Sequence, residues 1–178
     1  MCRYDMELSR VFMGEGGDIM RLSRHVQASL RARWAGYAPP SSCTLVPLPS
    51  DVSGPTKNPW GASVLAVVPT MRFPEPVAWH RDLVYNSMWS LLAEISLWNR
   101  TSKRINRVLM TGLGTGVGEI GVEVCARQMV LAVKHWTQPV LHEPDWEDVL
   151  PRVREVEDTF GKHASTLPQI FPATQKMF

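Results

Sequence analysis

The chain has few cysteines and no long run of apolar residues. Its 178 residues include three cysteines, Cys2, Cys43 and Cys125, which lie far apart and form neither a metal-ligand pair nor a disulfide framework. This usage is typical of a reducing compartment. The longest apolar run, 64–68, is far too short to span a bilayer, and the N-terminus has no apolar segment of signal-peptide length. We therefore expect an intracellular protein, cytoplasmic or nuclear, with no membrane partner.

Strong net charge is also lacking. Nineteen lysines and arginines stand against 17 acidic residues, which gives a formal net charge of +2. A nearly neutral domain does not attract polyanions strongly, so no specific nucleic-acid partner is expected. Four arginines do gather in the segment 19–34: Arg21, Arg24, Arg31 and Arg33. A solvated helix face explains them better than a phosphate-binding patch, because the domain as a whole carries almost no charge.

The side-chain patterns of common catalytic sites are absent. The five histidines are scattered without the spacing of metal ligands, and no serine or cysteine sits in a nucleophile-elbow pattern. We expect neither a metal nor a cofactor.

The strongest pattern in the chain is a glycine-rich loop between an apolar run and a helix. The run 105–111 has the length of a strand, and residues 122–136 repeat apolar side chains at the period of a helix. A loop that opens a helix is suited to phosphate, because the first helical N–H groups are unpaired and the helix dipole is positive there. The candidate ligand-binding residues in this loop are Gly112, Gly114, Thr115, Gly116, Val117 and Gly118.

Several features of the loop leave its role open. The stretch 116–121 fits the letters of the dinucleotide-binding fingerprint, but the acidic residue expected about 20 residues later has no clear candidate. The Lys-Ser/Thr ending of a P-loop is missing as well. Glu119 and Glu123 suit the helix dipole but repel a nearby anion. A tight strand-to-helix turn that binds nothing remains an equal alternative.

Apolar periodicity and turn residues divide the chain into alternating helices and strands. Helices are expected over about 4–12, 19–34, 82–98, 122–136 and 146–156, and strands over 42–48, 63–68 and 105–111. Alternation of this kind predicts an α/β fold with a largely parallel sheet. Three strands are few for a sheet between two layers of helices, so we expect the sheet to be incomplete.

Several motifs, in this order along the chain, resemble macro domains. They are the stretches 43–49, 69–72, 84–92, 111–118 and 125–132. The match is closest to the fungal macro domain-like branch and covers about residues 3–136. The resemblance implies a three-layer α/β/α sandwich that binds ADP-ribose, with 111–118 as its second phosphate-binding loop.

The N-terminal part departs from that family. Macro domains open with strands that carry an adenine-reading Asp, followed by an Asn-rich loop beside the distal ribose, and this chain has neither segment. It therefore resembles an N-terminally shortened macro domain. We expect a core over 1–136 and a Pro-containing extension over 137–178 that is partly helical or disordered.

The resemblance favours binding of ADP-ribose or an ADP-ribosylated protein. The glycine loop would hold the pyrophosphate and distal ribose, and Arg72 and Phe73 would wall the cleft from another loop. One alternative is a hydrolase of ADP-ribose derivatives, for which Asp5 and Glu119 are the nearest candidate bases. Another is a degenerate scaffold without a ligand. A dinucleotide-dependent oxidoreductase is disfavoured because the acidic ribose partner is missing.

Overall fold

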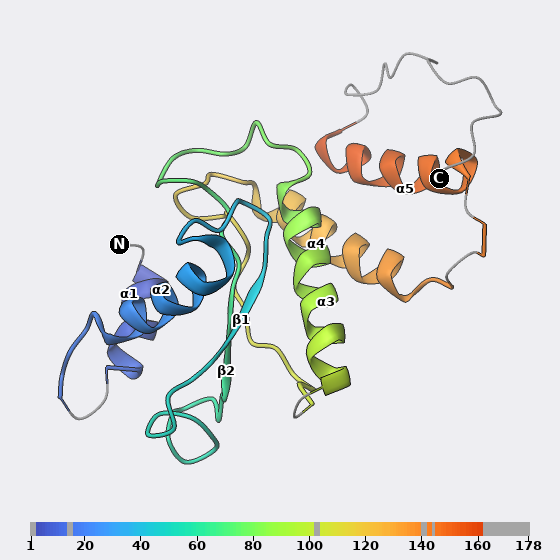
Figure 1. Cartoon of the computed structure of the whole chain (residues 1–178). Helices are drawn as coiled ribbons and strands as arrows, with labels where there is room; N and C mark the ends of the chain where they lie inside the picture. The colour runs from blue at the N-terminus through green and yellow to red at the C-terminus, as the bar shows by residue number, and fades with distance from the viewer. Residues whose placement is uncertain (1–2, 14–15, 102–103, 140–141, 144, 162–178) are drawn as a thin grey trace.

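The structure is a computed structural model that describes residues 3–13, 16–101, 104–139, 142–143 and 145–161. Its elements are α1 (Arg3–Val11), α2 (Arg21–Trp34), β1 (Thr44–Pro47), β2 (Val64–Val67), α3 (Leu83–Thr101), α4 (Val122–Thr137), α5 (Trp146–Glu157) and the short 3-10 helix η1 (Asp158–Phe160) (Figure 1). The described residues thus form a mixed α/β fold of five α-helices and a two-stranded sheet.

The helices lie where the apolar periodicity predicts them, and a polar side chain caps the start of α5. The Asp18 carboxylate accepts a hydrogen bond of 3.1 Å from the Met20 amide just before α2. That helix ends at Ala35, whose φ of 52° is left-handed. At the start of α5, Asp145 and Asp148 exchange side-chain to backbone hydrogen bonds of 3.0 and 3.1 Å. This capping box satisfies amides that have no partner within the helix.

The prediction of a largely parallel sheet is wrong. Strands β1 and β2 pair antiparallel, with Val46 opposite Leu65 and Pro47 opposite Val64. The intervening segment 48–63 contains turns but no helix, so the chain reverses directly. A parallel pair needs a longer crossover, usually a helix. Two strands form a ribbon rather than a full middle layer, so the described residues do not show a three-layer sandwich.

The strand predicted over 105–111 is also absent. The backbone there is irregular, and Val108 and Leu109 are 47% and 66% exposed. The side-chain amide of Asn99 bonds both backbone groups of Ile105, with its Oδ1 2.7 Å from the amide nitrogen and its Nδ2 3.2 Å from the carbonyl oxygen. An apolar run becomes a strand only beside another strand, and the two-stranded sheet does not extend to this segment.

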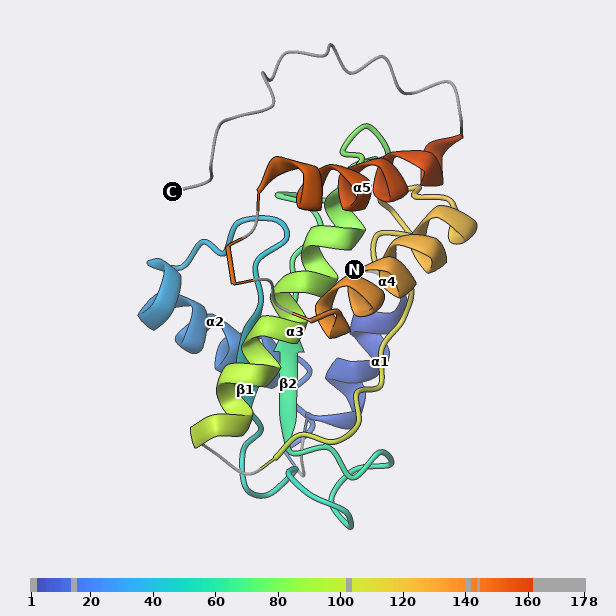
Figure 2. The same ribbon diagram turned by 90° about the vertical axis from the view of Figure 1, so that its right-hand side faces the viewer.

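The main core lies where α3 and α4 pack against each other and against the sheet (Figures 1 and 2). Its buried members are Cys43, Met88, Leu91 and Ala132, with Leu45 and Ala66 of the strands packed against them. A second cluster joins α1 and α2 to the segment after β1 and contains Phe12, Leu22, Leu48 and Val52. Figure 1 shows α1 and α2 on one side of the strands and α3 and α4 on the other.

The segment after α4 returns to the body of the protein. Helix α5 lies against α4, and Glu155 bonds both Lys134 and His135 of that helix, at 2.5 and 3.2 Å. The helical part of the predicted extension is therefore present, whereas residues 162–178 lie outside the described residues. None of the described helices combines the length and the apolar character needed to cross a membrane.

Candidate functional site

The glycine loop folds back on itself before α4. The Ile120 amide donates to the Gly114 carbonyl oxygen at 3.1 Å, and the Glu119 amide donates to the Gly116 carbonyl oxygen at 3.0 Å. Gly114 has a φ of +68° and Glu119 a φ of +57°, both left-handed. The left-handed backbone at Gly114 is one that glycine adopts without strain. The predicted strand before the loop is not needed for this turn.

The loop carries free hydrogen-bond donors. In the described part of the chain, the amides of residues 113–118 donate no hydrogen bond to another protein group. Helix α4 begins directly after Gly121, and no side chain caps that end. Free amides beside the positive end of a helix dipole are the groups that bind an anion. Gly116 and Val117 are exposed and can offer their amides to an anion, whereas Gly118 is buried.

The hydroxyl of Thr115 is already engaged inside the loop. Its Oγ1 donates to the Gly112 carbonyl oxygen at 3.1 Å. This hydrogen bond stiffens the first half of the loop, and the hydroxyl must leave it to donate to a ligand. Val117 is 46% exposed and Gly116 is exposed, so the tip of the loop is open to solvent.

Two of the glycines are required by the turn itself, Gly118 by packing and Gly114 by its left-handed φ of +68°. A Cβ on Gly118 would stand 2.5 Å from the Gly114 oxygen and 2.9 Å from Cγ2 of Val77. A Cβ on Gly114 would stand 2.7 Å from Cδ1 of Ile120. These distances are too short for real contacts. Glycine at both positions is thus explained without a ligand, as the tight-turn alternative requires.

The structure brings the segment after β2 to the glycine loop. The Val77 amide donates to the Gly118 carbonyl oxygen at 2.9 Å. Val77 and Ile120 share one buried cluster, against which Met71 packs. Arg72 and Phe73 follow Met71 and are exposed, Phe73 by 62%. Within the described residues neither side chain forms a hydrogen bond, an ion pair or a ring contact, so both are free of protein partners.

Glu119 and Glu123, whose negative charges oppose the binding of an anion at the loop, differ in their surroundings. Glu123 in the first turn of α4 pairs with Arg127 at 2.6 Å, which offsets its charge. Glu119 is exposed in the loop itself. Its charge lies within a Debye length of the loop amides and opposes the binding of an anion there.

The candidate bases for a hydrolase are not assembled into a catalytic site. Asp5 is exposed on α1, and α1 packs in the cluster of Phe12 and Leu22 rather than in that of Val77 and Ile120. Across the residues that can be described, no three His, Cys, Asp or Glu side chains lie close enough to hold a metal ion.

The arginines of α2 are largely committed to carboxylates. Arg21 forms two hydrogen bonds with Asp51, of 2.6 and 2.7 Å, and Arg24 pairs with Asp18. Arg33 pairs with Glu94 of α3. These pairs match a solvated helix face rather than a phosphate-binding patch.

The sequence did not reveal a small pocket beside the start of α4. This pocket of about 180 Å³ lies between the segment 78–81, the first turns of α4 and Phe160. The guanidinium of Arg81 lies 5.7 Å from the centre of the Phe160 ring, and Gln128 bonds Thr159 at 3.1 Å. A glutamine on the apolar face of α4 is the one sequence signal for this contact, since a buried amide needs partners.

Comparison of the chain with protein-family models, with curated proteins and with solved structures gave no match. What the loop can do therefore follows from its own amides, its packing and its charges.

Proposed function

We propose that this chain is a macro domain-like protein that binds ADP-ribose or an ADP-ribosylated protein through the loop of residues 112–118. The observation that carries the proposal is the set of amides over 113–118 that donate no hydrogen bond within the described protein. They stand at the uncapped start of α4, where the helix dipole favours a negative charge. A pyrophosphate offers enough acceptor oxygens to use several of these amides at once.

Two further features support this proposal. Arg72, in the segment tied to the loop through Val77 and Gly118, is a cation without a carboxylate partner in the described chain. Exposed Phe73 next to it offers an aromatic face to a base or ribose. The helices on both sides of the strands in Figure 1 fit a fold related to the three-layer α/β/α sandwich of macro domains, with a reduced sheet.

A scaffold without a ligand is the second candidate, because packing and backbone conformation explain two glycines of the loop. Gly118 leaves no room for a Cβ and Gly114 has a left-handed φ of +68°, whatever the loop binds. A protein that had lost its ligand would keep both glycines to preserve the turn. The two candidate functions therefore predict different effects of a substitution at Gly116, which lies at the exposed tip of the loop.

Calorimetric titration of ADP-ribose into the protein and its variants separates these functions. Wild type should bind, and Gly116→Glu should lower the affinity at least tenfold, or about 1.4 kcal/mol, because it adds bulk and a like charge beside the phosphates. Arg72→Ala should weaken binding with an unchanged melting temperature. Arg31→Ala is the matched control. It removes an exposed arginine on α2, far along the chain from Arg72, and should leave the affinity unchanged.

Two outcomes speak against phosphate binding at this loop. If wild type produces no binding heat with ADP-ribose, the scaffold is the better description. If wild type binds and Gly116→Glu binds equally well with the same melting temperature, the ligand sits elsewhere on the protein.

A further inference from the structure

The two edges of the β1–β2 sheet differ in how they are covered. Helix α2 lies beside β1 (Figure 2), where Nε2 of His25 is 2.7 Å from the Pro47 carbonyl oxygen. Pro47 has no amide hydrogen, so it offers no free donor on that side. The indole N–H of Trp34 donates to Oγ1 of Thr44 at 2.8 Å. The outer edge of β1 is therefore closed by α2.

The outer edge of β2 carries unpaired backbone groups. The Leu48 amide donates to the Ser63 carbonyl oxygen at 2.9 Å, and hydrogen-bonded pairs recur at every second residue of an antiparallel ladder. Residues 63, 65 and 67 therefore face β1, whereas the N–H and C=O groups of Val64 and Ala66 point away from it. Among the described residues, these outward groups have no hydrogen-bond partner.

The features that usually protect an edge strand are missing from β2. Proteins cover such edges with a helix or loop, or place charged side chains and proline on them. The segment 62–68 contains no charged residue and no proline. The side chains of Val64–Val67 are only partly buried. The strand thus presents an apolar, uncharged edge that nothing in the described chain pairs.

The segment 105–111 lies on this open side of β2. Figure 2 shows β1 on one side of β2 and the yellow segment on the other, and in Figure 1 all three lie between α1 and α2 on one side and α3 and α4 on the other. Met110 packs against the same buried cluster as Ala66 of β2. The segment is therefore close to the layer of the sheet without being paired to it.

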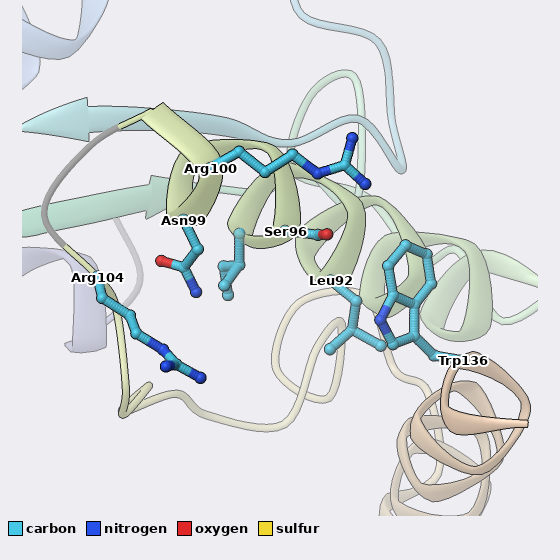
Figure 3. A pocket seen from close by; sticks show the side chains of 7 residues that line it. Leu92, Ser96, Asn99, Arg100, Arg104 and Trp136 are labelled. Atoms are coloured by element: carbon cyan, nitrogen blue, oxygen red, sulfur yellow. The ribbon is translucent and has the colours of Figure 1, made fainter.

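Backbone groups along this segment are also unpaired. Asn99 bonds both backbone groups of Ile105 and so anchors the start of the segment to α3; Figure 3 shows Asn99 on that helix and Arg104 on the returning chain. In the part of the protein that is described, no backbone N–H or C=O group of residues 106–111 forms a hydrogen bond within the protein. Leu109 is 66% exposed. The open edge of β2 is thus bordered by a second unpaired, partly apolar stretch.

We propose that the edge of β2 binds an extended segment of another protein, which adds to the sheet as a third strand. The free N–H and C=O groups of β2 recur at every second residue, about 6.8 Å apart. An extended backbone repeats donors and acceptors at the same interval, so its partial charges are complementary to this edge. Addition of a strand to an exposed sheet edge is a common mode of peptide recognition, in which main-chain hydrogen bonds supply affinity. The pairing uses none of the residues of the glycine loop, so it does not depend on the binding of ADP-ribose.

The surroundings of β2 determine the side chains of the partner. Leu65 packs against the cluster of α1 and α2 on one face of the sheet, and Ala66 packs against the cluster of α3 and α4 on the other. A strand beside β2 therefore meets apolar surface on both faces, as a buried strand does. No charge in the segment 62–68 is available to pair with a charge on the partner. The partner segment is thus a continuous, uncharged apolar run of about five residues.

Titration of the protein with a synthetic peptide tests the proposal. The peptide carries residues 64–68 of this chain, which form such an apolar run, between two pairs of lysines that keep it in solution. The wild type should bind it with saturation in calorimetry. The same peptide with its central amides N-methylated keeps the side chains but cannot donate hydrogen bonds, and it should bind at least tenfold more weakly. Equal binding of the two peptides would show that backbone pairing does not hold them, and would overturn the proposal.

Substitutions at Val64 test whether the peptide binds at this edge. Val64→Pro removes an outward N–H at the first residue of β2, a position where a strand tolerates proline, and should weaken peptide binding at least fivefold. Val64→Ala keeps the amide and is the matched control, which should bind like wild type. The melting temperatures of both variants show whether the fold is retained. If Val64→Pro keeps the wild-type melting temperature and affinity, the peptide binds elsewhere and the proposal is wrong.

Hydrogen exchange of the wild type gives a readout that needs no substitution. Saturation with the peptide should slow exchange at the amides of Val64 and Ala66 at least tenfold. The amides of Leu65 and Val67 already face β1 and should not change. The proposal is overturned if the wild type does not bind the peptide, or if the slowing does not alternate in this way. It is also overturned if the protein alone forms a dimer that protects Val64 and Ala66, because the occupant is then a second copy.

Discussion

The backbone amide of Val77 donates a hydrogen bond of 2.9 Å to the carbonyl oxygen of Gly118, and the side chain of Val77 fills the space in which a Cβ on Gly118 would stand. Through this pair the segment that carries Arg72 and Phe73 is joined to the glycine loop. The two segments come from different parts of the chain and share one buried cluster.

The close approach at Gly118 predicts that Gly118→Ala destabilises the fold. The new methyl group would stand 2.5 Å from the Gly114 oxygen, so the loop must shift or release its contact with Val77. We expect a loss of about 1–3 kcal/mol in the free energy of unfolding, measured by urea denaturation. Gly16→Ala is the control, since nothing lies within 4 Å of its Cβ position. Equal stability of the two variants would contradict the packing at Gly118.

The buried ring of His135 predicts a cost for Tyr85→Phe. Its Nε2 lies 3.2 Å from the Glu155 carboxylate, which only accepts, so Nε2 carries a proton. Its Nδ1 lies 3.0 Å from the Tyr85 hydroxyl, with which it forms a hydrogen bond. Removing that hydroxyl leaves a buried ring nitrogen unpaired, which costs about 1–3 kcal/mol.

Thermal unfolding measures this cost for Tyr85→Phe. Tyr37→Phe is the matched control, because Tyr37 is 54% exposed and water replaces any partner that its hydroxyl loses. A melting temperature of Tyr85→Phe equal to that of the control would show that the hydroxyl does not bond His135.

The attachment of α5 should weaken in acid. The hydrogen bond from Lys134 lowers the pKa of Glu155 below its ordinary value of 4.5, partial burial opposes this shift, and the hydrogen bond with His135 adds to the lowering. A lowered pKa means that the charged carboxylate stabilises the folded state above about 4.5, and that this contribution is lost as the pH falls through the folded-state pKa.

Hydrogen exchange of the α5 amides measures this loss. In the wild type, the protection of the α5 amides relative to those of α3 should fall between about pH 5 and about pH 3. This is the range over which the Glu155 carboxylate becomes protonated in the folded protein. Glu155→Gln should have lower protection at pH 5 and a flatter pH dependence. A wild-type profile that matches the variant would mean that Glu155 does not hold α5.

Both described cysteines should react slowly in the folded protein. Burial raises the pKa of the Cys43 thiol to about 12, and it also raises that of Cys125. The thiolate is the reactive form, so little of either group is available near pH 8. Iodoacetamide labelling followed by peptide mapping should show both sites protected in the native protein and labelled in urea. Rapid native labelling of Cys43 would contradict its burial at 3% exposure.

The helices were predictable from the sequence because their signals are local. The steps of three and four from Val84 to Trp98 depend only on which residues follow one another, and α3 covers this range. Strands need partners that the local pattern does not contain. The run 105–111 has strand composition but no neighbouring strand. Strands β1 and β2 pair antiparallel because the segment between them contains no helix that could carry the chain back for a parallel pair.

The turn at the candidate site was predictable to a similar extent, and its role in binding stays a prediction. The glycines of the loop stand out in the sequence, and the turn that they form is a local structure. Its neighbours come from distant segments: Val77 reaches Gly118, and Phe160 lines the pocket beside the start of α4. Spacing along the chain says nothing about such contacts, because they depend on how α3, α4 and α5 pack together.

The most direct test of phosphate binding by the loop is an amide NMR titration of the isotope-labelled protein with ADP-ribose. The proposal predicts that the amide resonances of residues 113–118 shift together and saturate at one dissociation constant. The amides of Glu119 and Ile120, which already donate to carbonyl oxygens of the loop, should shift less. Saturable shifts that leave 113–118 unchanged, or no shifts at all, would contradict the claim that these amides bind the pyrophosphate.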